Sequence, residues 1–152
     1  MKKTISIPEW HQMAENGDAP PVRIQLNGSS MFPLVRMNRD YVTVVPLNEL
    51  PVIGDIVMFC EPDTGRYVVH RVWEMKEGQI RTWGDQCAYP DRWMSPDAIW
   101  GKVTLIERGK RKIITDPDKG MRWAKIWHHF SRPYRIFDRY RQAIMGRVKK
   151  WT

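Results

Sequence analysis

The first two thirds of the chain consist of short apolar segments that end at turn-forming residues. Val22, Ile24 and Leu26 alternate with polar residues, which is the period-2 pattern of a strand with one buried face. Gly, Pro and Asp residues separate the segments and favour tight turns between them. Six short strands with few helices predict a mainly β fold, either a coiled antiparallel sheet or a partly open barrel. The predicted strands cover residues 22–26, 41–45, 56–59, 66–75, 79–83 and 99–106.

The pattern changes after Gly109, where apolar residues recur at spacings of three and four. This spacing predicts helices. Ser131 followed by Pro133 predicts a break between two of them, because serine caps a helix and proline fits its first turn. Another short helix is predicted around residues 8–14. We therefore expect an N-terminal segment 1–21, a β domain 22–106 and a helical tail 107–152. The helical stripe comprises Trp123, Ile126, Trp127, Phe130, Phe137, Tyr140, Ile144 and Val148.

Positive charge is concentrated in the tail. Residues 107–152 carry 14 Lys and Arg residues against 4 Asp and Glu residues, a net charge of +10. The rest of the chain holds the remaining 11 basic and 13 acidic residues, a net charge of −2. With 42% hydrophobic and 28% charged residues among 152, the composition excludes an intrinsically disordered protein. It suits one folded domain with its own core.

Three partners are compatible with this basic, aromatic tail. Lys and Arg residues beside Trp123, Phe130 and Trp151 suit an interfacial helix on an anionic membrane surface, formed by residues 119–151. Alternatively, the apolar stripe packs on the β domain while the cations stay solvated. Nucleic acid fits least well, because no recognition motif accompanies the charge.

The sequence predicts neither a signal peptide nor a transmembrane helix. Ser6, Pro8 and Glu9 interrupt any apolar stretch behind the N-terminal lysines. No segment approaches the roughly 18 to 20 consecutive apolar residues that cross a bilayer. We expect a cytoplasmic protein, or one that is peripheral at the cytoplasmic membrane.

The two cysteines do not form a metal-binding pattern. Cys60 and Cys87 show neither C-x-x-C spacing nor a neighbouring histidine cluster, so we expect no metal and no cofactor. Cys60 ends an apolar segment and is expected to be a small buried residue. Cys87 lies in a polar loop, where we expect exposure to solvent.

Serine, histidine and aspartate residues occur in or after three of the predicted strands. Ser30 follows the first strand, His70 lies within an apolar strand, and Asp85 and Asp91 follow the strand at 79–83. Each residue alone has an ordinary explanation: serine and aspartate form turns, and histidine on an apolar strand often belongs to a core. Together they supply the nucleophile, base and orienting carboxylate of an activated serine, which is recognised by roles and not by chain order.

Five short motifs resemble those of the signal peptidase and SOS-repressor superfamily of serine peptidases. The serine motif has methionine after the nucleophile and proline two positions later. The histidine motif is similar to that of the endoplasmic reticulum and archaeal signal peptidases, where the bacterial branch has a lysine base. The resemblance therefore implies a histidine-base peptidase with a β fold of the signal peptidase type. The motifs are GSSMFP at 28–33, GDIVMF at 54–59, VHRV at 69–72, GDQCAYPD at 84–91 and IWGKV at 99–103.

The resemblance implies a role for each candidate residue. Ser30 is expected to be the nucleophile, His70 the general base and Asp91 the carboxylate that orients the imidazole. Asp85 is expected to be structural, and it is the alternative third residue. The backbone N–H groups of Ser29 and Ser30 are expected to hold the oxyanion.

Two positions depart from the family motifs. Gly28 stands where many signal peptidases carry a serine that donates to the oxyanion, which implies an oxyanion hole made of backbone groups alone. Phe32 replaces the acidic residue that is usual before the proline. The sequence also lacks the membrane anchor of the signal peptidases, which favours peptide maturation over general secretion.

These features lead to three hypotheses about function. The first is a serine endopeptidase that removes a leader or signal-like segment from a peptide or protein bound in an extended conformation. The second is a catalytically silent peptide-binding module of the same fold. The third is a basic regulatory or nucleic-acid-binding protein. For the first, a histidine base near its ordinary pKa of about 6.5 predicts activity that rises around neutral pH.

Overall fold

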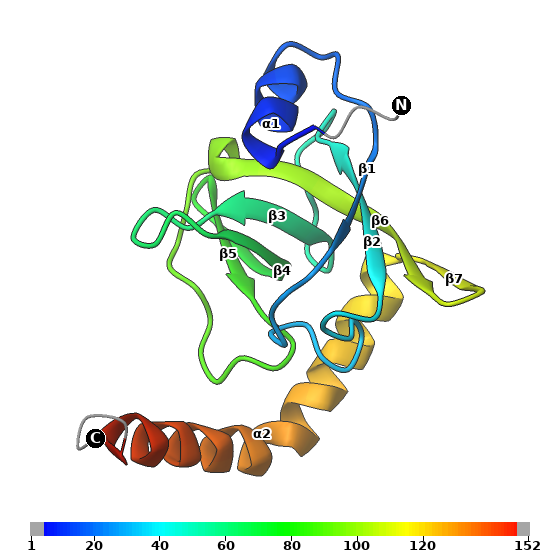
Figure 1. Ribbon diagram of the computed structural model, residues 1–152. Helices are drawn as coiled ribbons and strands as arrows, with labels where there is room; N and C mark the ends of the chain where they lie inside the picture. Colours follow the sequence, from blue (N-terminus) through cyan, green and yellow to red (C-terminus); the bar gives the residue numbers. More distant parts are fainter. Residues whose placement is uncertain (1–4, 149–152) are drawn as a thin grey trace.

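Seven strands, two α-helices and one short 3-10 helix make up the part of the chain that the structure describes (Figure 1). The computed structural model describes the backbone of residues 5–148, and their side chains except 138 and 141–148. In chain order the elements are α1 (Ile7–Glu15), β1 (Val22–Gln25), β2 (Tyr41–Pro46), β3 (Ile56–Cys60), β4 (Tyr67–Lys76), β5 (Gln79–Trp83), η1 (Pro96–Ala98), β6 (Ile99–Arg108), β7 (Arg111–Ile114) and α2 (Pro117–Val148).

All seven strands belong to one antiparallel sheet. Their order is β1-β2-β6-β3-β4-β5, with β7 paired to β6 beside this path. Within residues 5–148 the outer strands β1 and β5 do not pair with each other, so the sheet is not closed. The prediction of a mainly β protein with an antiparallel sheet and a C-terminal helix is therefore confirmed. The sequence did not indicate β7, because the strand opens with Arg111 and Lys112 and lacks a clear apolar alternation.

Helix α1 lies over the end of the sheet that is uppermost in Figure 1. Ser6 begins the helix with a capping box, in which its hydroxyl and the Glu9 carboxylate each accept from the other residue's backbone N–H. One turn later, Trp10 is fully buried. A Cβ atom on Gly101 of β6 would lie only 2.8 Å from the Trp10 ring. Glycine at this position lets α1 approach the sheet, so the N-terminal segment contributes to the core.

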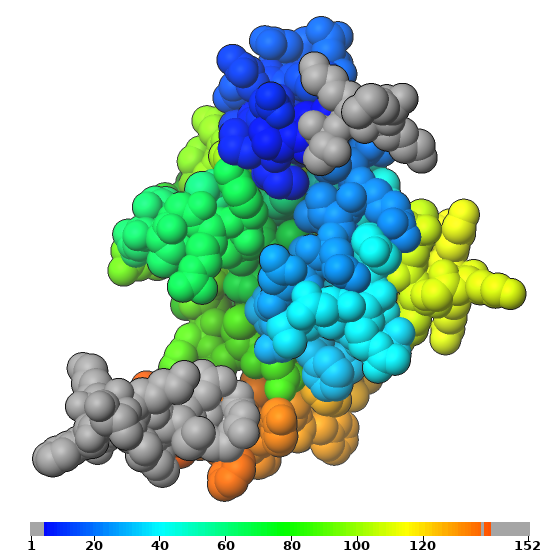
Figure 2. All heavy atoms as spheres, viewed as in Figure 1, coloured from blue at the N-terminus to red at the C-terminus, as the bar shows by residue number. Residues whose placement is uncertain are grey.

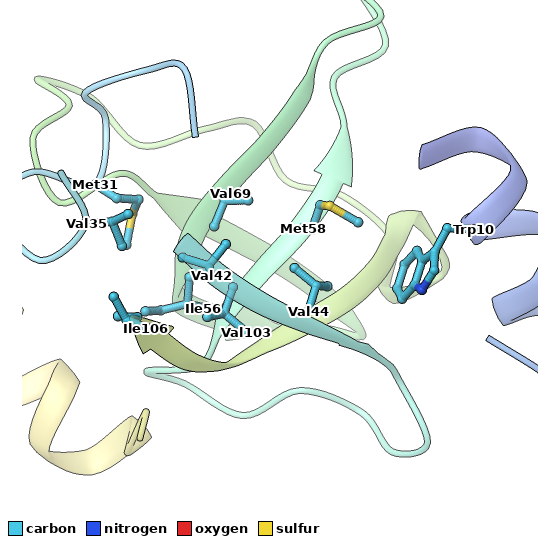
Figure 3. Packing of buried hydrophobic residues seen from close by; sticks show 10 residues of the cluster. All are labelled: Trp10, Met31, Val35, Val42, Val44, Ile56, Met58, Val69, Val103 and Ile106. Atoms are coloured by element: carbon cyan, nitrogen blue, oxygen red, sulfur yellow. The ribbon is translucent and has the colours of Figure 1, made fainter. Parts of the chain in front are cut away.

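The hydrophobic core has two clusters that lie on different sets of strand positions. In β4, Val69 belongs to the larger cluster while Val72 belongs to the smaller one, with Val68 packed against it, as expected when successive side chains point to opposite faces. The smaller cluster also contains Val57, Phe59, Ile80 and Ile99. The larger cluster, shown in Figure 3, contains Trp10, Met31, Val35, Val42, Val44, Ile56, Met58, Val69, Val103 and Ile106.

Helix α2 runs without interruption from Pro117 to Val148. The prediction of two helices separated at Ser131 and Pro133 is therefore wrong. A proline removes one backbone hydrogen bond and crowds the carbonyl four residues earlier, which bends a helix without necessarily ending it. Figure 1 shows that α2 changes direction about half way along its length. Ser131 does not cap a helix, because its hydroxyl donates to the Trp127 carbonyl one turn earlier at 2.6 Å.

The start of α2 is fixed against the β domain by a close backbone approach. Gly54 has a φ of +99°, and a Cβ atom there would lie 2.1 Å from the Pro117 carbonyl oxygen. Only glycine fits both requirements. Over residues 5–148, no helix combines the length and the apolar character needed to cross a bilayer. Trp151, which belongs to the predicted aromatic tail, lies outside the described residues.

Candidate active site

Ser30 lies on the loop between β1 and β2, and this loop is fixed from both sides. Its neighbour Met31 is fully buried in the larger cluster. Further along the loop, the buried Asp40 accepts hydrogen bonds from Arg36 at 2.8 Å and from Arg108 at 2.9 Å. Burial opposes ionisation of Asp40, but the two guanidinium groups outweigh it and lower its pKa from 3.8 to about 2. The serine therefore sits on a held loop.

Arg108 ties the serine loop to β6 through main-chain contacts as well. Besides Asp40, it donates to the carbonyl oxygens of Pro33 and Leu34 at 3.2 and 2.9 Å. No pattern in the sequence indicates this anchor. The spacing of Arg36 and Asp40 gives a local signal of an ion pair, but Arg108 is 68 residues away from Asp40 in the chain, so only the fold brings it there.

His70 lies in the middle of β4 and is bonded to Asp91. The two residues are brought together by the pairing of β4 with β5 and by the loop that follows β5. The distance between His70 Nδ1 and Asp91 Oδ2 is 2.6 Å. Thr82 of β5 donates its hydroxyl to the same carboxylate oxygen at 2.6 Å, and the Asp91 N–H donates to the Thr82 carbonyl at 2.8 Å. Asp91 is thus fixed by side-chain and main-chain contacts, and its bond to Nδ1 leaves Nε2 as the nitrogen available to a reacting group.

The environment of His70 favours its charged form. Burial alone would lower the pKa of the imidazole, but the hydrogen bond to Asp91, the contact with Cys87 and the charge of Asp91 raise it from 6.5 to about 9. Asp91 therefore stabilises the imidazolium that would form when His70 accepts a proton. With a pKa of about 9, His70 is protonated at neutral pH when no substrate is bound.

Asp85 has a different partner from Asp91. It accepts two hydrogen bonds from Arg71, the residue after His70, at 3.0 and 2.8 Å. Both side chains are almost completely buried, with 2% of the Arg71 side chain and none of the Asp85 side chain exposed. Arg71 also donates to the Gly54 carbonyl at 3.0 Å. The structure therefore pairs Asp91 with the histidine and Asp85 with the arginine, on opposite faces of β4.

Ser30 and His70 line the same groove, which has a volume of about 1140 Å³. The loop after β5 connects them, because the Gln86 N–H donates to the Ser30 carbonyl at 2.7 Å. A Cβ atom on Gly84 would lie 2.9 Å from both the His70 Nε2 atom and the Ser30 carbonyl oxygen. Glycine at this position therefore keeps the space between the serine loop and the imidazole open. Within residues 5–148, no hydrogen bond joins the Ser30 hydroxyl to His70.

Cys87 is the residue that the structure adds to this site. Its Sγ atom lies 3.9 Å from His70 Nε2, and the half-buried side chain lines the groove. The sequence places Cys87 in the loop between Asp85 and Asp91 but gives no sign of this contact. The turn that bonds the Cys87 N–H to the Gly84 carbonyl at 2.9 Å folds the loop back towards β4.

Ser29 and Ser30, whose backbone N–H groups are the predicted oxyanion donors, also line the groove. Within residues 5–148, the backbone N–H groups of Ser29 and Ser30 donate to no other backbone group. The turn that contains them is closed by the Phe32 N–H, which donates to the Ser29 carbonyl at 3.0 Å. Free N–H groups on a held turn are suited to stabilise negative charge that develops on a substrate oxygen.

The chain matches no protein-family model, and no curated protein matches it. The chemistry open to the site follows from its geometry. An aspartate fixes one nitrogen of the buried His70 imidazole, and His70 lines a groove. The same groove is lined by Ser29, Ser30 and Cys87, which supply a hydroxyl, a thiol and two backbone N–H groups. This set of groups can carry out acyl transfer through a side-chain nucleophile.

Proposed function

We propose that this protein is a serine endopeptidase resembling signal peptidase, with Ser30, His70 and Asp91 as its catalytic residues. The observation that carries the proposal is the 2.6 Å bond between His70 Nδ1 and Asp91, made on the edge of a groove that Ser30 also lines. The Asp85–Arg71 pair supports the choice of Asp91, because a carboxylate bonded twice to a buried guanidinium is not available to the imidazole.

The proposed reaction is acyl transfer in two steps. Neutral His70 takes the Ser30 hydroxyl proton on Nε2 while Oγ bonds to the carbonyl carbon of the scissile peptide. His70 then gives this proton to the leaving amine as the C–N bond breaks, which leaves an ester on Ser30. Water, activated by the same imidazole, hydrolyses the ester. In both steps the Ser29 and Ser30 N–H groups stabilise the oxyanion.

The lining of the groove suits an extended peptide segment. It comes mainly from the end of β1 and the following loop, from the start of β4 and from the loop after β5. Extended substrates bind beside strands through main-chain hydrogen bonds, with pockets for alternate side chains. The apolar lining residues include Ile24, Leu26, Met58, Val68 and Val69. We therefore propose that the substrate is a leader or signal-like segment with apolar residues next to the cleavage site.

Labelling with a fluorophosphonate probe tests the proposal without a known substrate. We expect the wild-type protein to be labelled at Ser30, and Ser30→Ala to remain unlabelled with an unchanged thermal unfolding curve. Ser29→Ala is the matched control, because it removes a hydroxyl from the neighbouring position and should leave labelling intact. If the wild-type protein is not labelled at any pH but still binds apolar peptides, the chain is a binding module and the peptidase proposal fails.

A second candidate nucleophile is Cys87, favoured by its contact with His70. The sulfur lies 3.9 Å from Nε2, whereas the Ser30 hydroxyl makes no such contact in the described structure. A thiol beside an imidazole that is oriented by aspartate is the arrangement of a cysteine peptidase. In that case Sγ would bond to the substrate carbon, and the intermediate would be a thioester.

Selective modification separates the two nucleophiles. If Ser30 is the nucleophile, we expect Cys87→Ala to keep fluorophosphonate labelling and peptide cleavage, and iodoacetamide to inhibit only proteins that retain Cys87. Cys60→Ala provides the matched control, since Cys60 ends β3 and does not line the groove. Loss of cleavage in Cys87→Ala, with full cleavage in Ser30→Ala, would assign the reaction to the thiol instead.

A further inference from the structure

Helix α2 packs on the β domain through a face that is not its apolar face. The buried positions recur at spacings of three and four, which places them on one side of the helix. Two of them are small or apolar and three are polar. They are Met121, Ala124, His128, Ser131 and Arg135.

The polar residues of this face make specific contacts that fix the rotation of the helix. His128 packs against a pair of tryptophans of the sheet that contact each other, with its ring centroid 4.7 Å from that of Trp73 and 4.3 Å from that of Trp83. Arg135 donates to His128 Nδ1 at 2.6 Å and to the His128 carbonyl at 2.8 Å. Because His128 packs on this tryptophan pair, the opposite side of α2 faces outward.

The outward side carries most of the large apolar residues of α2. Phe130 is 75% exposed, and Phe137 and Tyr140 are each 68% exposed. These three residues belong to the apolar stripe, and one alternative from the sequence was that this stripe packs on the β domain. For these three residues that alternative is wrong. Ile126 and Tyr134 lie on the same side and are each 60% exposed. Figure 2 shows the first part of α2, in orange, as an outer layer at the bottom of the β domain.

Positive charge flanks the exposed apolar residues. Arg122, Lys125, Arg132 and Arg139 are all exposed. Among the described side chains of α2, Asp118 is the only acidic one. A row of aromatic and aliphatic side chains bordered by cations is complementary to an anionic lipid surface, where rings enter the headgroup region and cations bind phosphates. The same positive charge disfavours pairing with a second copy of this helix.

We infer that the outward face of α2 binds anionic membrane surfaces, with Phe130 and Phe137 as the main apolar contacts. The helix lies in the plane of the interface and does not cross it. Arg135 and Arg139 of α2 also line the groove that contains Ser30 and His70. Arg135 belongs to the buried face of α2, so the helix meets the groove on the side opposite the proposed membrane-binding face. The inference does not depend on the peptidase chemistry, and Ser30→Ala should bind membranes as the wild-type protein does.

Sedimentation with vesicles tests the inference. We expect the wild-type protein to bind vesicles of phosphatidylcholine with about one third phosphatidylglycerol and not vesicles of phosphatidylcholine alone, with binding weakened by salt. The double variant Phe130→Ser/Phe137→Ser should bind at least about tenfold more weakly, since both rings lose their burial in lipid. Leu50→Ser/Ile114→Ser is the matched control. It removes two equally exposed apolar side chains, 68% and 81% exposed, from the β domain and should bind as the wild type does.

Several results would overturn the inference. The first is that the wild-type protein does not sediment with the anionic vesicles. The second is that the Phe130→Ser/Phe137→Ser variant binds them as tightly as the control variant does. Tighter binding to DNA or RNA than to the anionic vesicles would identify nucleic acid as the partner. A dimer in solution that the phenylalanine variant dissociates would identify a second copy. Because Phe130 and Phe137 are exposed, the thermal unfolding of the double variant should match the wild type, which separates loss of binding from loss of fold.

Discussion

This protein has two buried histidines, which lie on either side of one edge of the sheet. Their pKa values are shifted in opposite directions. His70 is 6% exposed and His128 is 7% exposed, so burial alone does not distinguish them. His70 faces the carboxylate of Asp91, which raises its pKa to about 9. His128 loses solvation and faces the guanidinium groups of Arg135 and Arg71, which lowers its pKa to about 4. Burial lowers both pKa values, and the charged neighbours then either outweigh this effect, as at His70, or add to it, as at His128.

Because their pKa values differ in this way, the two histidines have different roles. Arg135 can only donate a hydrogen bond, so His128 accepts it on Nδ1 and serves as a neutral docking residue between helix and sheet. His70 is held in one orientation by an anion and keeps Nε2 towards the groove, as a proton acceptor requires. The two histidines also affect stability in opposite pH ranges. The contribution of His70, whose pKa is raised, is complete below pH 6.5 and is lost as the pH rises through about 9. The contribution of His128, whose pKa is lowered, is complete above 6.5 and is lost as the pH falls through about 4.

Removal of the anion beside His70 should have the largest effect on activity. We expect Asp91→Asn to lower kcat/KM about ten-thousandfold, because the imidazole loses both its orientation and the charge that stabilises the imidazolium. The variant should stay folded, since Asp91 is partly exposed and its backbone bonds remain. Cleavage of a fluorogenic apolar peptide, measured beside far-UV circular dichroism, checks both statements. A folded Asp91→Asn protein with wild-type turnover would remove Asp91 from the proposed mechanism.

Asp85→Asn should change stability more than activity, because Asp85 lies on the other side of β4 from the His70–Asp91 pair. The substitution leaves the buried Arg71 without its counter-charge, and breaking a buried pair in this way costs about 3–5 kcal/mol. We expect Tm to fall by roughly 10 °C, while the protein that remains folded at low temperature keeps most of its turnover. If Asp85→Asn is fully folded and inactive, the assignment of the two aspartates is reversed.

The pH dependence of activity should report the raised pKa of His70. Because Ser30 needs a neutral base, activity should rise about tenfold per unit from pH 7 and level off above about 9, a gain of about a hundredfold. This limb lies well above the neutral range that the ordinary pKa of histidine suggests. In Asp91→Asn the residual activity should level off at a lower pH, because the largest of the contributions that raise the pKa of His70 is lost and burial is then opposed only by the contact with Cys87. If the activity of the wild-type protein instead rises near pH 6.5, the bond between His70 and Asp91 does not hold in solution.

The smallest effect concerns the docking histidine at acid pH. Between pH 6.5 and 4.5 we expect stability to fall by about 2 kcal/mol, because the unfolded chain takes up a proton on His128 that the folded protein, with its lowered pKa, does not. His128→Asn keeps an acceptor for Arg135 but does not titrate in this range, so its stability should depend less on pH than that of the wild type. Urea denaturation at the two pH values measures the difference. His129→Asn, at the exposed neighbouring position, should behave like the wild type, and the same behaviour in both variants would contradict the role of His128.

The sequence predicted six of the seven strands to within a few residues and did not indicate β7. Alternation in Val22, Ile24 and Leu26, and turns rich in Gly, Pro and Asp, are local signals that do not depend on the rest of the fold. The catalytic candidates also came from the sequence, through the order of five motifs. The structure then places His70 beside Asp91, and both beside the groove that Ser30 lines. Their catalytic roles remain proposals.

Other features depend on contacts between distant residues, and the sequence did not reveal them. The approach of Cys87 to His70 follows from how one loop folds back onto β4. The bonds from Arg108 to Asp40 join residues 68 positions apart. No local pattern encodes such distances, because they are set by strand pairing and by the close approaches that Gly54 and Gly84 allow.

Helix α2 separates the two kinds of information most clearly. Its sequence alone determined that the segment is helical, basic and rich in aromatic residues, because periodicity and charge are properties of the chain itself. Which side faces the protein was decided only by the tertiary structure. Trp73 and Trp83 offer a site for the His128 ring, and that contact turns the more apolar side of the helix towards solvent. Hydrophobic periodicity reports that a helix has two faces, but the surface on which it packs determines which face is buried.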